Sequence, residues 1–244
     1  MRTKIYDCCK ELRLSATFAE NALSMSGDTC QEYLLKVLRA ELDFRDNKRK
    51  KLYLKQAGFD VMKTFENYDF NRIIIPGSIT LEGIRTLDFM TRKENLILYG
   101  RNGVGKSHMA TAIGVECCMK GKKIRFYKTA ALVNELTDAK AKGSLATLLK
   151  KLSTLDLLIC DEWGYLPFDA EGSQLLFQVI ADCYEKRSLI ITTNIEFSKW
   201  NGIFYDDQLT AALIDRLVHH SHLIVFDRDS WRFEHSLMKD SATN

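Results

Sequence analysis

GRNGVGKS, at residues 100–107, directly follows the apolar run Asn95–Tyr99 and precedes a helical pattern. Its glycines permit a tight backbone turn that points several N–H groups at one anion. The helix that follows adds the positive end of its dipole. A G-x-x-x-x-G-K-S pattern in this strand–loop–helix setting predicts a P-loop for the phosphates of ATP, with Lys106 at the β- and γ-phosphates and Ser107 on Mg²⁺.

The nucleotide-binding stretch that we predict continues one residue past this pattern. It consists of Gly100, Arg101, Asn102, Gly103, Val104, Gly105, Lys106, Ser107 and His108.

Two consecutive carboxylates end a second apolar run, Leu157–Cys160. An acidic residue at the end of a buried strand is placed to hold Mg²⁺ beside a P-loop, and we predict this role for Asp161. The next residue, Glu162, is predicted to be the base that polarises the attacking water. The pair indicates the P-loop class in which an extra strand separates the two motifs. That strand is 188–193, and Asn194 after it is predicted to contact the water or the γ-phosphate, unless it only makes a turn.

Apolar runs alternate with helical patterns through the rest of the chain. This alternation predicts an α/β fold with a parallel sheet covered on both faces. The expected strands are 95–99, 124–127, 156–160, 188–193 and 223–226, and the expected helices are 79–90, 107–119, 130–140, 145–152, 172–185 and 209–220.

The N-terminal quarter differs in pattern and charge. Two or three helices are expected between residues 4 and 57, with a break at residues 26–28 and a cap at Asp28 or Thr29. Residues 1–65 carry 13 Lys/Arg and 9 Asp/Glu, although the whole chain has a net charge of only +3. The basic stretch 45–55 fits either phosphate binding or a solvated helix face, and charge alone leaves both open. We predict a helical domain at 1–65 and an ATPase domain at 66–244.

The composition, with 46% hydrophobic and 27% charged residues, is typical of a globular protein. No run approaches the roughly 20 apolar residues of a membrane helix, and residues 1–7 lack a signal-peptide core, so we expect a cytoplasmic protein without membrane contact. Seven cysteines without a C-x-x-C pair favour reduced, mostly buried thiols. His108, His219 and His220 have no partner at metal spacing and are interpreted as packing or surface residues.

Arg216 lies on the last expected helix. An arginine there can reach the ATP of a neighbouring subunit or form a surface pair with Asp215, and position alone leaves both open.

Together these residues resemble the IstB group of AAA+ ATPases, the helper proteins of IS21-type transposons, which are relatives of the helicase loaders DnaC and DnaI. The resemblance covers nearly the whole chain. Its most specific part is Asp161–Pro167, and further matches are residues 12–15, 41–51, 68–70, 103–108, 193–194, 197–200 and 215–220. The family has Gly-Pro-Pro-Gly where this chain has Gly100 to Gly103.

The resemblance implies an AAA+ core of five parallel strands in the order 5-1-4-3-2, with no C-terminal helical lid. It implies ATP-dependent homo-oligomers on duplex DNA with little sequence preference, and an IS21-type transposase as partner. Arg216 matches the family's arginine finger, and the N-terminal helices match its self-assembly domain. By analogy with related loaders, Lys128, Lys140 and Lys142 are candidate DNA contacts.

Two other functions compete with this one. A replicative helicase loader shares most of the chemistry but prefers single-stranded DNA and a helicase. A small-molecule P-loop kinase needs a lid over its acceptor, and no insertion of that kind is visible in the sequence.

Overall fold

The computed structural model describes residues 1–66, 68–71, 73–165, 168–204, 206–227 and 229–231. The chain divides into two compact units, Met1–Tyr53 and Leu54–Asn244. The domains expected from the sequence, 1–65 and 66–244, remain a prediction.

Three helices, α1 (Arg2–Glu11), α2 (Ala16–Ser24) and α3 (Cys30–Ala57), cover the first unit, where the sequence predicts two or three; the last four residues of α3 belong to the second unit. Of the two predicted caps, Thr29 begins α3: its Oγ1 accepts a hydrogen bond from Glu32 N at 3.1 Å. The Glu32 carboxylate in turn accepts from Asp28 N at 3.0 Å. These two hydrogen bonds satisfy backbone donors at and just before the start of α3 that the helix itself leaves unpaired.

The first unit buries few large apolar side chains. A network of charged and polar groups links its helices instead. The Glu41 carboxylate on α3 is buried and accepts hydrogen bonds from the Ser15 hydroxyl, from Ser15 N at 3.1 Å and from Arg45 Nε at 2.7 Å. Arg45 Nη2 also donates to Arg13 O at 2.8 Å. Burial alone raises the pKa of Glu41, but the hydrogen bonds from Ser15 and Arg45 outweigh it and leave the pKa below its ordinary value.

The second unit contains the sheet. Its strands are β1 (Ile73–Ile74), β2 (Asn95–Gly100), β3 (Ile124–Lys128), β4 (Leu157–Trp163), β5 (Ser188–Thr193) and β6 (Ser221–Phe226). Its helices are α4 (Leu81–Thr86), α5 (Asp88–Thr91), α6 (Lys106–Met119), α7 (Thr129–Ala141), α8 (Leu145–Ser153), α9 (Ala170–Cys183), α10 (Asp207–His219) and the 3₁₀ helix η1 (Phe197–Gly202). The helix predicted at 79–90 is broken at Leu87, whose left-handed backbone (φ 69°) separates α4 from α5.

The sheet order is β1-β6-β2-β5-β4-β3. Five of these strands are parallel, and numbered from β2 they stand in the predicted order 5-1-4-3-2. The expected count of five strands was wrong, because β1 adds a sixth, antiparallel strand at the edge, with Ile73 opposite Phe226. A two-residue strand is too short to show a period-two pattern in the sequence.

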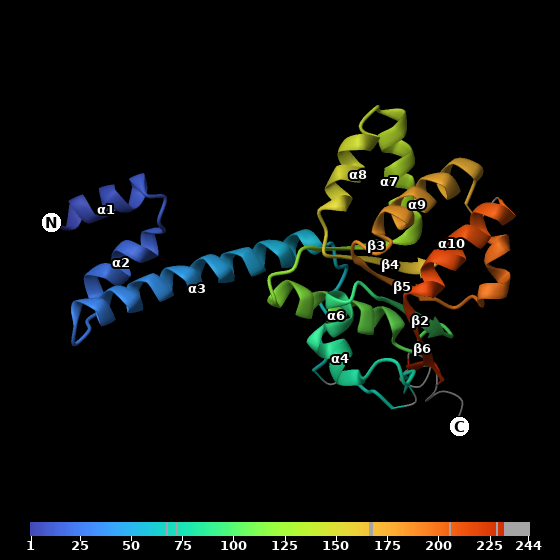
Figure 1. Cartoon of the computed structure of the whole chain (residues 1–244), viewed down its shortest axis with the longest axis horizontal. Coiled ribbons are helices and arrows are strands. Elements are labelled where there is room, and N and C mark those ends of the chain that lie inside the picture. Colours follow the sequence, from blue (N-terminus) through green and yellow to red (C-terminus); the bar gives the residue numbers. More distant parts are fainter. Residues whose placement is uncertain (67, 72, 166–167, 205, 228, 232–244) are drawn as a thin grey trace, which may run out of the picture. The chain divides into compact units, whose positions relative to one another are not determined.

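Both faces of the sheet are covered, as Figure 1 shows, with α4 and α6 on one side and α7, α9 and α10 on the other. Successive residues of β4 serve the two faces in turn. Leu158 and Cys160 belong to the apolar cluster that includes α7 and α9. Ile159 points the other way and contacts α6, where a Cβ on Gly114 would lie 3.0 Å from its Cδ1. The carboxyl ends of the strands are thereby fixed on a rigid base.

None of the helices in the described ranges has the length and apolar character needed to cross a membrane. The predicted absence of a lid after β6 concerns residues that, beyond Trp231, lie outside the described part of the chain.

Candidate functional site

The predicted P-loop connects β2 to α6. Gly103 and Gly105 have left-handed backbones, with φ of 81° and 98°, and Gly105 is the residue before the first turn of α6. An L-residue with a side chain rarely adopts these angles, so glycine is needed at both positions. The loop therefore ends on the N-terminus of a 14-residue helix, which carries the positive end of the helix dipole.

Lys106 curls back over this loop. Its side chain is buried, and its ammonium donates to the carbonyl oxygens of Gly100 and Arg101, each at 2.7 Å. The positive charge of Lys106 is thus held beside the N-terminus of α6. The ammonium and the positive end of the helix dipole both attract anions there.

Asp161 lies beside the first turn of the same helix. This carboxylate is buried, and its Oδ1 accepts hydrogen bonds from Ser107 Oγ at 2.8 Å and from the Thr192 hydroxyl. The parallel strands β2, β5 and β4 are neighbours in the sheet. Their carboxyl ends lie at the same edge, so residues from three distant segments of the chain meet there.

Glu162 sits in a bulge of β4. The ladder to β5 pairs Cys160 with Ile191 and Trp163 with Thr193, so two residues of β4 stand opposite one of β5. Glu162 takes a left-handed backbone (φ 58°), and its N–H donates to Thr192 Oγ1 at 3.0 Å. Such a bulge re-aims a side chain, and Glu162 is exposed although it stands between two buried residues. A non-glycine residue held at positive φ often marks a functional position.

One cavity of about 650 Å³ brings the predicted groups together. Lys106, Ser107, Asp161, Glu162 and Asn194 all line it. Further lining residues were not predicted as site residues: Tyr68, Asp69, Thr111, Tyr165, Thr192 and Trp231. Thr192 could have been noticed as a polar residue within an apolar strand, whereas Tyr68 and Trp231 reach the cavity only through tertiary contacts.

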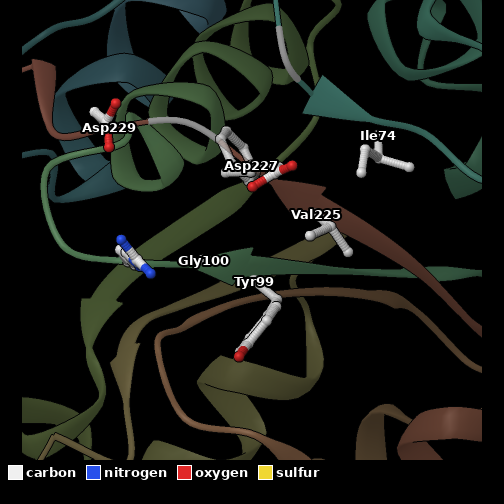
Figure 2. A pocket seen from close by; sticks show the side chains of 8 residues that line it. Ile74, Tyr99, Gly100, Val225, Asp227 and Asp229 are labelled. Carbon is white, nitrogen blue, oxygen red and sulfur yellow. The ribbon is translucent and has the colours of Figure 1, made fainter.

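Parts of the predicted nucleotide-binding stretch lie elsewhere. Asn102, Gly103 and His108 line the main cavity, but Val104 is fully buried beneath the loop. Gly100 and Arg101 instead line a second cavity of about 470 Å³ against β1 and β6. Figure 2 shows Ile74 beside Val225 there, with Asp227 and Asp229 along the segment that follows β6. This second cavity lacks Lys106 and Ser107 and carries two carboxylates, so it does not suit phosphate.

Arg216 is not among the residues that line the main cavity. It lies near the end of α10, and its guanidinium carbon is 5.0 Å from the centre of the Phe177 ring. Its Nη1 is buried and has no hydrogen-bond partner within the described ranges. The surface pair with Asp215 is not among the ion pairs of the described residues.

The three lysines proposed for DNA do not form one patch. Lys128 precedes α7, lines the main cavity and lies 3.8 Å from Asp60. Lys140 and Lys142 stand at the other end of α7 and pair with Glu171 at 2.6 Å and Asp138 at 3.9 Å.

The histidines have different surroundings. His108 Nε2 is 2.9 Å from Thr64 O, and its ring centre is 4.7 Å from that of Tyr68. His219 and His220, which showed no partner in the sequence, meet Glu185 in space, with His220 Nε2 3.2 Å from Glu185 Oε1.

The residues present fit a magnesium nucleotide. A buried carboxylate and a hydroxyl 2.8 Å apart are the hard oxygen donors that Mg²⁺ prefers. The glycine backbone, the start of α6 and the Lys106 ammonium form an anion cradle next to them.

The chain matches the family described as IstB-like ATP binding protein over residues 10–239. It is 36% identical to the ATP-binding protein of insertion sequence IS232 from Bacillus thuringiensis subsp. berliner, over 86% of this chain and 84% of that one. It is 32% identical to the ATP-binding protein of insertion sequence IS5376 from Geobacillus stearothermophilus, over 98% of both chains.

Two solved structures share its fold. AMPPCP-bound DnaA from Aquifex aeolicus matches with a TM-score of 0.57 at 19% identity, over 77% of this chain and 57% of that chain. DnaI matches with a TM-score of 0.52 at 16% identity, over 69% of this chain and 89% of that one. These likenesses identify an AAA+ P-loop fold. Leu166 and Pro167, which belong to the resemblance seen in the sequence, lie outside the described residues.

Proposed function

Because this chain belongs to the family of IstB-like ATP binding proteins, we propose that it is a Mg²⁺-dependent ATPase that assembles on duplex DNA and directs a partner transposase. The observation that carries the ATPase part is the shared cavity of Lys106, Ser107, Asp161, Glu162 and Asn194.

Each of these side chains has a distinct task in the proposal. Lys106 and the loop N–H groups bind the phosphates, and Ser107 and Asp161 hold Mg²⁺, which neutralises phosphate charge when bound. Glu162 accepts the proton of the attacking water, and its exposure on the bulge leaves it accessible to that water. Asn194 orients the water or the γ-phosphate.

Arg216 completes the site from a neighbouring copy. The side chain lies near the end of α10 and outside the cavity of its own subunit, so it is not placed to act on the nucleotide of the same copy. An arginine from an adjacent subunit can stabilise the charge that develops on the γ-phosphate in the transition state.

The first unit provides the proposed self-assembly surface. Leu34, Leu35, Leu38 and Leu42 on α3 are each 44–66% exposed. Leucines at this helical spacing form one apolar stripe, which a second copy of the unit buries.

Insertion-sequence relatives support the DNA and transposase parts of the proposal. The basic stretch 45–55 and the lysines at the end of α7 supply positive charge for the DNA backbone. Phosphate contacts carry no base identity, which suits duplex binding with little sequence preference.

The test compares ATP-dependent assembly of the full chain on duplex and single-stranded DNA of equal length, by sedimentation and by electron microscopy. We expect large assemblies with ATP and duplex DNA, none with the Lys106→Ala variant, and stimulation of the cognate transposase by the wild-type chain alone. A preference for single-stranded DNA would contradict the transposition role and favour helicase loading.

A further inference from the structure

The main cavity has two sides relative to the P-loop. In the sheet, β2 stands between β5 and β6. Asp161 and Glu162 near the end of β4, and Asn194 after β5, lie on one side of β2. Trp231 follows β6 on the opposite side and lines the same cavity. If the γ-phosphate meets the carboxylates, the rest of the nucleotide extends toward Trp231.

The segment after β6 is in direct contact with the P-loop. Trp231 N donates to Gly103 O at 3.1 Å. A Cβ on Gly103 would lie 2.1 Å from Ser230 Oγ, so only glycine allows this approach. The Trp231 side chain remains 54% exposed at the cavity. A large apolar ring is thus held by its backbone beside the phosphate cradle.

A second segment borders the same side of the cavity. The Tyr68 hydroxyl donates to Gly105 O at 3.2 Å, and the neighbouring Asp69 also lines the cavity. This segment leads into β1, which pairs with β6 through Ile73 and Phe226. Tyr68 precedes Ile73 by as many residues as Trp231 follows Phe226. In an antiparallel pair, the segment that precedes one strand and the segment that follows the other lie at the same end of the ladder.

We propose that Trp231, together with Tyr68 and Asp69, forms the subsite for the purine base of the bound nucleotide, with the base stacked on the indole ring. This proposal rests on nucleotide binding in the main cavity. Stacking of a base on an aromatic ring changes affinity by roughly tenfold to hundredfold. In this arrangement, the segment that follows β6 binds the base, and the adjoining P-loop binds the phosphates.

Tryptophan fluorescence offers a direct test. The chain has three tryptophans, and Trp163 and Trp200 are fully buried, so acrylamide quenching reports mainly on Trp231. We expect ATP and ADP to protect the full chain from quenching, and tripolyphosphate, which has no base, to give little protection. The nucleotide-dependent change should vanish in Trp231→Phe. Equal protection by tripolyphosphate and ATP would overturn the subsite.

Affinity measurements separate this proposal from the proposed function. Trp231→Ala should weaken ATP binding roughly tenfold or more while leaving tripolyphosphate binding unchanged, and Trp231→Phe should retain most of the affinity. Tyr165→Ala is the matched control, because Tyr165 is an exposed aromatic residue of the same cavity that follows β4. Loss of base affinity in Tyr165→Ala rather than Trp231→Ala would overturn the subsite. Failure of the wild-type chain to bind either ATP or tripolyphosphate would instead refute the proposed function and this subsite with it.

Discussion

The two compact units of this chain are stabilised in different ways. In the second unit, Ile97, Leu98, Ile159 and Ile190 are at most 1% exposed, and helices cover the sheet on both faces. In the first unit, a buried carboxylate with its donors joins the turn before α2 to α3, while leucines of α3 remain exposed.

This difference indicates a division of labour. A unit with a closed apolar core keeps its geometry by itself, which a site for phosphate chemistry requires. A unit that leaves an apolar stripe uncovered gains stability when another molecule covers it. We therefore expect substitutions in the second unit to change nucleotide chemistry and substitutions in the first unit to change assembly or local stability.

The largest effect is expected at Arg216, which in the proposed function completes the site of a neighbouring subunit. Arg216→Ala should reduce DNA-stimulated ATP hydrolysis by about a thousandfold, because transition-state charge is left uncompensated. Lys106→Ala, with an intact Arg216, should be inactive through loss of ATP binding. Mixing the two variants should restore part of the activity, measured as phosphate release. Full activity of Arg216→Ala alone would exclude the trans role.

Glu162→Gln should lower hydrolysis by at least about a hundredfold while ATP affinity stays within about twofold of wild type, because the amide keeps the shape and cannot accept the proton. Single-turnover hydrolysis and equilibrium ATP binding measure the two quantities. Glu171→Gln is the control, since Glu171 pairs with Lys140 outside the cavity. Retained turnover in Glu162→Gln would remove Glu162 as the base.

Glu41→Gln should destabilise the first unit by about 2 kcal/mol, because hydrogen bonds to a buried charge are weakened. The lowered pKa of Glu41 means that the charged form stabilises the folded unit. That contribution is complete above the unfolded pKa of about 4.3 and is lost as the pH falls through the lower folded value, so the difference between wild type and variant should shrink below about pH 4. Hydrogen exchange provides the measurement, at the Ser15 amide, which donates to Glu41, and at the Phe18 amide, which donates to Ser15 Oγ at 3.0 Å. Exposed Glu20→Gln is the matched control, and a similar loss of protection there would contradict the network.

Leu38→Glu should weaken ATP-dependent assembly by about tenfold, since it places a charge within the apolar stripe of α3. ATP binding by the unassembled chain should not change. Leu12→Glu is the comparison, because Leu12 is 70% exposed but does not belong to α3. Analytical ultracentrifugation distinguishes the two, and equal assembly by both variants would rule out the stripe.

The sequence predicted most reliably those features that depend on neighbouring residues. The P-loop and the acidic pair were recognisable because each follows an apolar run at a fixed spacing. The break at Leu87 was not, since leucine gives no signal for a left-handed backbone. Trp231 was missed for a different reason: its contact with Gly103 joins positions far apart in the chain, and no local pattern encodes it.

Thr192 links two groups that the proposed reaction treats separately. Its hydroxyl donates to Asp161 and accepts from the backbone of Glu162, so one oxygen atom positions both the proposed metal ligand and the proposed base. In the proposed reaction, metal affinity and turnover are therefore coupled through this hydroxyl. A natural variant that shifts β5 against β4 would alter its magnesium requirement and its rate together, and recovery of one would tend to restore the other.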